Sequence, residues 1–270
     1  MADDLDATDP DDPRADDLDV GRLLRLDGRV AVVTGASGGL GDRFARVLHA
    51  AGASVVAAAR RRDRLEALAG DLERVVPVTC DVSSGDDRER LVEAALAVDG
   101  HIDVLVNNAG IGTPMPAEDE PVDHFARVVD VNLTAVFALS QLVGRHMIER
   151  GSGAIVNVAS ILGLVASAPI KQASYAASKG AVVNLTRELA VQWARKGVRV
   201  NALAPGWFPS EMTTDMFTDE ASIAFLQRNA PMGRGGRLAE LDGALLLLAA
   251  DAGSYITGQT LVVDGGWTAR

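Results

Sequence analysis

Short apolar runs, many of them rich in β-branched residues, alternate along the chain with longer segments of helical composition. The short runs indicate buried strands, because they are bounded by turn-forming residues such as glycine, asparagine and proline. We expect these strands at residues 29–34, 53–59, 74–80, 102–106, 154–158, 198–203 and 261–263. The apolar spacing between them predicts helices at residues 42–51, 63–72, 86–98, 122–147 and 173–196.

A regular alternation of strands and helices is typical of an α/β protein with a parallel sheet. The chain shows no internal repeat and no linker between two halves. We therefore predict a single Rossmann-type domain, in which a doubly wound parallel sheet of about seven strands carries helices on both faces. Ligands of such sheets bind beyond the carboxyl ends of the strands, so we look for chemistry in the turns at that edge.

Charge is spread unevenly over the 270 residues, whose formal net charge is −11. Residues 1–20 hold nine Asp and one Arg, which gives −8 and leaves −3 for the other 250 residues. A segment so acidic and so poor in apolar residues cannot bury enough surface to fold. We expect residues 1–25 to form a disordered acidic tail and residues 26–270 to form the folded domain.

The composition argues against several functional classes. The sequence has no basic stripe of the kind that binds nucleic acid, and its longest apolar run is far too short for a membrane span. The N-terminus has no signal-peptide pattern, and Cys80 is the only cysteine, which favours a reducing, cytoplasmic location. The four histidines lack metal-ligand spacing, so we expect no metal site.

A glycine-rich turn, residues 35–41, lies between the first predicted strand and the first predicted helix. A strand, a glycine turn and a helix in this order present backbone N–H groups at a helix N-terminus, where a phosphate can bind. Glycines also permit the close backbone approach that a pyrophosphate needs. Because the spacing is not the usual G-x-G-x-x-G, a tight structural turn is an equal alternative from the glycines alone.

The end of the second predicted strand carries a basic cluster that begins at Arg60 and Arg61. In a dinucleotide fold, an acidic residue roughly 20 positions after the glycines binds the adenosine ribose hydroxyls. Here Ala59 and Arg60 occupy that place, so a 2′-phosphate would meet cations and no carboxylate. This pattern favours NADP(H) over NAD(H). The alternative is a solvated basic start to the helix at residues 63–72.

Tyr175 and Lys179 are four residues apart in a segment of helical composition, so both side chains project from one helix face. A phenol titrates near ~10, and a neighbouring ammonium lowers that value. A tyrosine so tuned can pass a proton near neutral pH, and Ser160 could hydrogen-bond a carbonyl or alcohol oxygen. The alternative is a packed ring beside a solvated amine.

Together these residues resemble the short-chain dehydrogenase/reductase family over residues 26–267. The resemblance rests on three motifs, Thr34-Gly35-x-x-x-Gly39-x-Gly41, Asn107-Asn108-Ala109-Gly110 and Pro205-Gly206, and on a match to the family's catalytic tetrad at Asn132, Ser160, Tyr175 and Lys179. The resemblance implies that Tyr175 exchanges a proton with the substrate oxygen. It also implies that Lys179 holds the nicotinamide ribose and lowers the Tyr175 pKa, that Ser160 orients the carbonyl, and that Asn132 anchors a water.

The resemblance further implies an NADP(H) site, because members with a neutral residue at position 59 and Arg at position 60 are typically NADP-dependent. The residues expected to bind the cofactor are Gly35, Ser37, Gly39, Leu40, Arg60, Arg61, Asp81, Val82, Asn108, Ala109, Gly110, Tyr175, Lys179, Pro205, Gly206, Phe208 and Ser210. Two features depart from the family pattern. Gly38 stands where many NADP-dependent members carry a basic residue, and the interval from Ser160 to Tyr175 is longer than usual.

Residues 208–237 are expected to form a substrate lid. Its apolar residues are Met212, Met216, Phe217, Ile223, Phe225 and Leu226, and the loop before Tyr175 adds Leu162, Leu164, Val165 and Ile170. We predict a mainly apolar pocket for a medium-sized ketone or secondary alcohol. The alternative is that half of these residues only pack the lid onto the body of the domain.

Three functions remain open from the sequence. The first is an NADP(H)-dependent carbonyl reductase or alcohol dehydrogenase, the second a 3-oxoacyl-[acyl-carrier-protein] reductase, and the third a non-catalytic NADP-binding sensor or scaffold. The resemblance also implies a homotetramer, or a dimer, assembled through residues 122–147, 173–196 and 264–267.

Overall fold

The computed structural model describes residue 19, residues 21–167 and residues 169–270 of the chain. Within this part a seven-stranded parallel sheet runs in the order β3-β2-β1-β4-β5-β6-β7. The strands are β1 (Val30–Thr34), β2 (Ser54–Ala59), β3 (Val75–Thr79), β4 (Val104–Asn107), β5 (Gly153–Val158), β6 (Val198–Pro205) and β7 (Thr260–Val263). Each predicted strand is confirmed, with its ends displaced by at most two residues.

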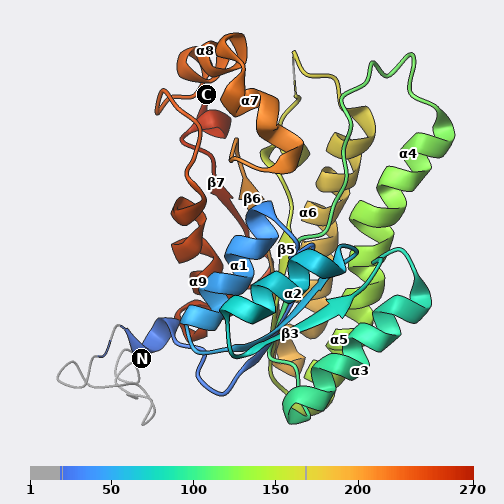
Figure 1. Cartoon of the computed structure of the whole chain (residues 1–270), viewed down its shortest axis with the longest axis vertical. Coiled ribbons are helices and arrows are strands. Elements are labelled where there is room, and N and C mark those ends of the chain that lie inside the picture. The colour runs from blue at the N-terminus through green and yellow to red at the C-terminus, as the bar shows by residue number, and fades with distance from the viewer. Residues whose placement is uncertain (1–18, 20, 168) are drawn as a thin grey trace, which may run out of the picture.

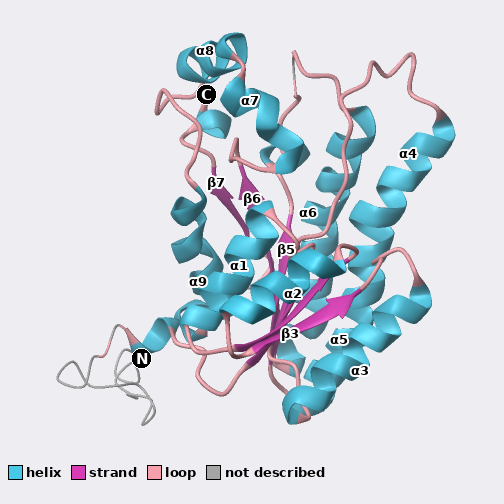
Figure 2. Ribbon diagram, in the orientation of Figure 1, coloured by secondary structure: helices cyan, strands magenta, loops and turns pink. Residues whose placement is uncertain are grey.

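Helices cover the sheet on both faces, as Figure 2 shows by the cyan coils around the magenta strands. They are α1 (Gly39–Ala50), α2 (Arg62–Asp71), α3 (Gly85–Asp99), α4 (Val122–Val129), α5 (Ala135–Arg150), α6 (Ala173–Trp193), α7 (Thr214–Thr218), α8 (Glu220–Asn229) and α9 (Asp242–Ala249). The predicted Rossmann-type architecture is therefore confirmed. Helix α9 was not predicted, because its run of leucines is apolar on every side and has no helical periodicity.

Alternate residues of the strands face two separate cores. In β1, Ala31 and Val33 pack into one core with α1, α2 and α9, whereas Val30 and Val32 pack into the other with α3, α5 and α6. Such two-sided burial explains why the strands read as continuous apolar runs rather than alternating ones.

The strand order places the site. The chain passes from β3 at one edge of the sheet to β4 beside β1, so the turns after β1 and β4 diverge at a topological switch point. Helices α7 and α8, and the long loop before α4, extend beyond the carboxyl ends of β6 and β7 at the top of Figure 1. An opening at this edge is lined by the turns after β1, β2, β3 and β4 and by residues after β6.

The single helix predicted over residues 122–147 is interrupted. A π-helical turn, Asp130–Thr134, separates α4 from α5. Such single π turns occur frequently at functional sites, because the extra residue redirects a side chain. The turn contains Asn132, whose side chain is completely buried.

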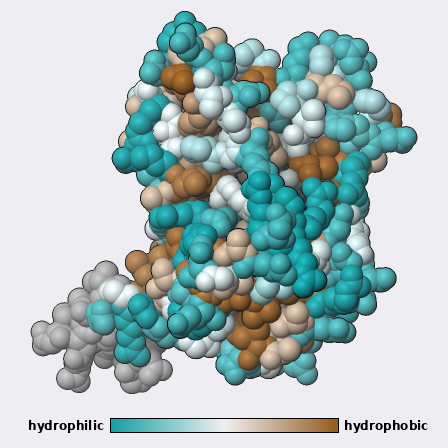
Figure 3. Space-filling model, in the orientation of Figure 1, coloured by the Kyte–Doolittle hydropathy of each residue, from teal (hydrophilic) through white to brown (hydrophobic). Residues whose placement is uncertain are grey.

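The predicted acidic tail lies mostly outside the described residues. Of its last residues, Arg22–Leu24 form a short 3₁₀ turn near the Asp251–Gly253 turn, and Leu26 is fully buried. The folded part therefore includes a few residues that precede the predicted boundary. Its surface in Figure 3 shows hydrophobic residues as separate patches among hydrophilic ones.

Among the described residues one helix, Val122–Arg150, is long and apolar enough to cross a membrane by length and composition. Of its most apolar window, 44% is buried inside the domain. Because α5 packs against β4 and β5, this helix has the position of a core helix. Within the same residues no group of three or more His, Cys, Asp or Glu is placed to hold a metal ion.

Candidate active site

The glycine turn after β1 is held tightly against the end of β4. Gly35 has a φ of +67°, and a Cβ there would lie 2.8 Å from Asn108 Nδ2, so only glycine fits. Asn108 Nδ2 donates to the Thr34 carbonyl over 2.9 Å, and Thr34 Oγ1 accepts from the Asn108 and Ala109 amides over 3.0 Å. The Asn108 side chain thus fixes the turn, and the residue also lines the larger cavity described below.

Tyr175, Ser160 and Lys179 converge beyond the carboxyl end of β5. Lys179 is 4% exposed, and its Nζ donates to the Val158 carbonyl over 2.7 Å and lies 5.7 Å from the centre of the Tyr175 ring. A Cβ at Gly112, in the loop after β4, would lie 2.7 Å from the ring carbon Cδ2. The ring is thus held between helix α6 and the loop after β4.

Lys179 is not among the groups that set the Tyr175 pKa in this structure, so the lowering of that pKa by Lys179 stays a prediction. Burial raises the pKa of Tyr175, and the hydrogen bond with Ser160 is what opposes that rise. Burial also lowers the pKa of Lys179 to about 8. With a pKa of about 8 the amine is still mostly protonated at neutral pH, and it lies 5.7 Å from the centre of the Tyr175 ring.

Asn132 links the π-helical turn to the loop after β4 and to helix α6. Its Oδ1 accepts from the Ile111 amide over 2.8 Å, and its Nδ2 donates to the Ile111 carbonyl over 2.8 Å and to Ser178 Oγ over 3.1 Å. Both Asn132 Oδ1 and Lys179 Nζ face the space beside Gly110. We call Asn132, Ser160, Tyr175 and Lys179 the tetrad.

The turn after β3 borders the opening as predicted. Asp81 Oδ1 accepts from the Ser83 amide over 2.9 Å and from Ser83 Oγ over 2.6 Å, and these bonds hold the Asp81 pKa below its usual range. Arg127 Nη2 lies 3.7 Å from Asp81 Oδ2. The neighbouring Cys80 is buried, which raises its thiol pKa to about 11 and leaves it protonated at neutral pH.

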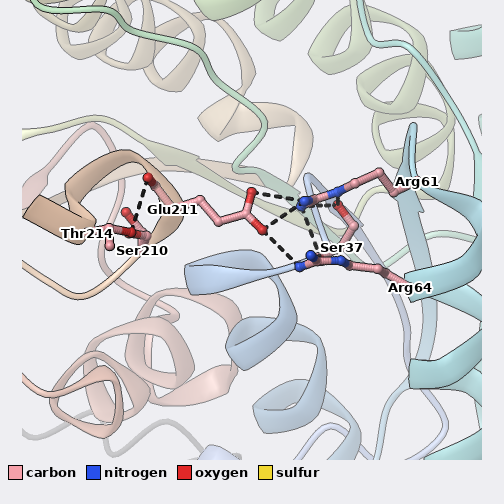
Figure 4. A network of polar contacts seen from close by, with 6 residues as sticks. All are labelled: Ser37, Arg61, Arg64, Ser210, Glu211 and Thr214. Atoms are coloured by element: carbon pink, nitrogen blue, oxygen red, sulfur yellow. Dashed lines mark hydrogen bonds and ion pairs between the residues drawn. The ribbon is translucent and has the colours of Figure 1, made fainter.

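A cluster of ions joins the basic turn after β2 to the start of the lid (Figure 4). Arg61 Nη1 donates to both carboxylate oxygens of Glu211, over 2.8 and 2.9 Å, and Arg64 Nη1 donates to Glu211 Oε1 over 2.9 Å. Arg61 also binds Ser37 Oγ through Nε and Nη2. We call Arg61, Arg64 and Glu211 the lid ion-pair cluster.

Sequence reasoning missed Arg64 and Glu211. Arg61 and Arg64 are three residues apart at the start of α2, and this spacing would have predicted both guanidinium groups on one side of the helix. Nothing in the sequence pairs Glu211 with them, because 147 residues separate Glu211 from Arg64.

Two adjoining cavities occupy the edge of the sheet above the switch point. The larger, about 690 Å³, is lined by the glycine turn, by Arg60, Arg61, Asp81 and Val82, and by every other residue predicted to bind cofactor. The smaller, about 410 Å³, lies under the lid. The residues that line both are Ser160, Tyr175, Gly206, Met212 and Thr213.

The lid residues divide between the smaller cavity and the core. The side that lines the cavity includes Met212 and Met216, together with Leu162 and Ile170 from the loop before Tyr175. Phe217, Phe225 and Leu226 of the lid pack in a cluster around Trp207 and Trp267. Ile223 and Leu164 belong to neither group, and Leu164 is exposed. Polar lining comes from Lys171, Gln172, Thr213 and Asp215, so the cavity is mixed rather than purely apolar.

The larger cavity fits a dinucleotide. Its size is within the range of cofactor clefts, it extends from the glycine turn at the N-terminus of α1 to the tetrad, and its arginines offer donors to a phosphate. The smaller cavity opens beside Tyr175, where a second molecule would meet the reactive end of such a cofactor.

Comparisons with known proteins agree with this geometry. A family model described as enoyl-(acyl carrier protein) reductase matches residues 35–268. The chain is 43% identical to a cis-4-hydroxycyclohexanecarboxylate dehydrogenase of Sinomonas cyclohexanicum, over 89% of this chain and 97% of that protein.

Solved structures give the same result. A short-chain type dehydrogenase/reductase from Mycobacterium marinum superposes with a TM-score of 0.89 at 36% identity, over 93% of this chain and all of that chain. A gluconate 5-dehydrogenase from Burkholderia cenocepacia J2315, solved with NADP and tartrate, superposes with a TM-score of 0.88 at 38% identity over the same share of both chains. This chain is an oxidoreductase that belongs to the short-chain dehydrogenase/reductase family.

Proposed function

We propose that this chain transfers a hydride between NADP(H) and a medium-sized, moderately apolar ketone or secondary alcohol, using the tetrad. The observation that carries the proposal is that Ser160 and Tyr175 line both cavities. A cofactor in the larger cavity and a substrate in the smaller one would therefore meet at these two hydroxyl groups.

Each tetrad residue has a defined task in this proposal. The nicotinamide supplies or accepts the hydride. The Tyr175 hydroxyl gives its proton to the carbonyl oxygen during reduction, and the Ser160 hydroxyl donates a hydrogen bond to the same oxygen. Lys179, buried with its Nζ on the Val158 carbonyl, holds the cofactor ribose and relays the proton to Tyr175. Asn132 fixes the backbone at Ile111 and orients the water of that relay.

The relatives support a substrate that is cyclic or polyhydroxylated. One is named for a hydroxycyclohexane carboxylate and another for gluconate, and both names describe secondary alcohols that also carry a carboxylate. The Met212, Met216 and Leu162 lining of the smaller cavity favours the ring over the polyol, because a polyol would lose water there without regaining all its hydrogen bonds.

A substrate panel in the reductive direction tests the proposal. We expect kcat/KM with NADPH to be higher for cyclohexanone-type ketones than for the keto acid that forms when a secondary alcohol of gluconate is oxidised. A preference for the charged sugar acid would refute the apolar substrate, and absence of turnover across a broad panel would favour the sensor or scaffold.

The cofactor preference is tested by titrating NADPH and NADH onto the protein and onto Arg60→Ala. We expect the wild type to favour NADPH and the variant to lose that preference. Arg62→Ala is the matched control. Arg62 lies two residues after Arg60, and its exposed side chain pairs with Glu66. An unchanged preference in Arg60→Ala would mean that Arg60 is only a solvated helix start.

We also propose that the chain forms a cytoplasmic homotetramer through α4, α5 and α6. Large apolar side chains exposed on these helices support it: Val122 is 82% exposed, Phe137 42% and Val191 81%. Exposed apolar residues gathered on a few elements favour burial in an interface. Light scattering coupled to gel filtration tests it, and Val191→Glu should shift the protein towards smaller assemblies.

A further inference from the structure

We infer that Glu211 is a specificity-determining residue of the cofactor site: its carboxylate occupies the arginine pair that a ribose 2′-phosphate would bind, and it thereby limits the preference for NADP(H). The inference rests on the proposed assignment of the larger cavity to a nicotinamide dinucleotide. It goes beyond that assignment by giving the lid, rather than the end of β2 alone, control over which dinucleotide binds.

The first argument is position. A Cβ at Gly38, in the glycine turn, would lie 3.4 Å from both Arg61 Nη2 and Glu211 Oε1 and 3.6 Å from Arg64 Nη1. The lid ion-pair cluster therefore lies directly against the turn, and the Glu211 carboxylate bonds to both arginines there (Figure 4).

The second argument is donor capacity. Guanidinium groups bind carboxylates and phosphates through the same paired N–H geometry. Arg61 directs Nη1 to both Glu211 oxygens, while its Nε and Nη2 bind Ser37. A phosphate could reach the Nη1 donors only if Glu211 moved away. Two anions at one site would also repel each other.

The third argument is that this pair can exchange. The side chains of Arg61, Arg64 and Glu211 are 41%, 52% and 59% exposed. Solvent-exposed ion pairs contribute little to stability, so a phosphate can displace the carboxylate. The hydrogen bond from Arg61 also lowers the Glu211 pKa, which keeps the carboxylate charged at neutral pH.

The position of Glu211 is set by its own segment. Thr214 Oγ1 donates to the Ser210 carbonyl over 3.0 Å, which closes the first turn of the lid around Glu211. A Cβ at Gly39 would lie 3.3 Å from Ser210 Cβ, so the lid backbone rests on the glycine turn. NADH, which has no 2′-phosphate, would leave the lid ion-pair cluster intact, whereas NADPH would have to break it.

The test is the binding of adenosine 2′,5′-bisphosphate, 5′-AMP, NADPH and NADH to wild type and to Glu211→Gln, measured by calorimetry. We expect the variant to bind the two 2′-phosphorylated ligands about three- to tenfold more tightly, because a small exposed pair no longer competes. The affinities for 5′-AMP and NADH should not rise. Glu220→Gln is the matched control, since it removes the same charge from the exposed first turn of α8.

Unchanged affinities in Glu211→Gln, or an equal gain for 5′-AMP and the bisphosphate, would overturn the inference. So would an equal gain in Glu220→Gln, because the effect would then be one of net charge. In Glu211→Gln/Arg61→Met the gain should disappear, which excludes a general loosening of the lid. Failure of the proposed function is a separate result: it would appear as absence of turnover in the substrate panel, with the binding differences still present.

Discussion

Residues of the tetrad and of the lid ion-pair cluster line the same cavity but differ in their contact with solvent. Asn132 is completely buried and Lys179 is 4% exposed, whereas Glu211 is 59% exposed. Burial makes each hydrogen bond of the tetrad costly to break, because a donor or acceptor that loses its partner there cannot bind water instead. The exposed cluster can lose a partner and regain water, so its contacts are weak and exchangeable.

In the proposed function the two regions have different tasks. The tetrad needs groups held in one geometry, and low exposure provides that. The lid ion-pair cluster must admit and release a cofactor, and an ion pair of modest strength serves that purpose. The two regions should therefore respond to substitution with very different magnitudes.

The largest effect is expected for Tyr175→Phe. Removing the hydroxyl that transfers the proton should lower kcat by about 10²- to 10⁴-fold, with little change in NADPH affinity. Steady-state kinetics and a fluorescence titration measure both quantities. Tyr255→Phe is the matched control, because Tyr255 is the other tyrosine and is fully exposed. Substantial turnover by Tyr175→Phe would remove the tetrad from the mechanism.

Lys179→Met tests the buried amine through stability. Burial lowers the Lys179 pKa from 10.5 to about 8, and a shift of that size corresponds to about 3 kcal/mol. The unfolded chain therefore binds more protons than the folded chain, so this penalty is present in full below pH 8 and fades as the pH rises to 10.5.

Lys179→Met lacks that penalty, so its stability relative to wild type should fall between pH 8 and pH 10.5. Urea unfolding at a series of pH values measures the difference, and the lost bond to Val158 adds only a constant. Lys196→Met, at the exposed end of the same segment, should show no such trend. A difference independent of pH would mean that the Lys179 pKa is not lowered by folding.

Asn132→Ala should destabilise the fold by about 2 kcal/mol, because the amide and carbonyl of Ile111 lose their side-chain partners in a buried place. Thermal unfolding measures this loss. Asn184→Ala on helix α6 is the control, since Asn184 is exposed. Equal losses in both variants would show that the buried network contributes nothing beyond helix propensity.

The smallest effect is expected from salt. Raising the ionic strength shortens the Debye length from about 10 Å at 0.1 M to about 3 Å at 1 M, which screens exposed ions. The affinity gain of Glu211→Gln for adenosine 2′,5′-bisphosphate should therefore shrink as salt rises, while the kcat ratio of Tyr175→Phe to wild type should not change. A gain independent of salt would mean that Glu211 acts by shape and not by charge.

Much of this arrangement could be read from the sequence. The strands are continuous apolar runs because helices cover both faces of the sheet, and that pattern survives in the order of the residues alone. The glycine turn was recognisable because only glycine tolerates the backbone at Gly35. The pairing of Tyr175 with Lys179 followed from helical spacing, and both lie on α6 as predicted.

Three features needed the tertiary structure. The π-helical turn at Asn132 arises because its side chain must reach the loop after β4, a contact that no local pattern encodes. The direction of the Tyr175 pKa shift depends on how deeply the ring is buried, which spacing on one helix does not reveal. The lid ion-pair cluster joins segments that only the folded chain brings together.

The sequence by itself therefore determined the fold class, the glycine turn after β1 and the pairing of Tyr175 with Lys179 on one helix, because each depends on local backbone geometry or helical spacing. Tertiary structure decided which groups are charged, which are exposed and which compete for the same partner. Those properties depend on burial and on distances between remote segments, and the Glu211 carboxylate beside Arg61 is the example.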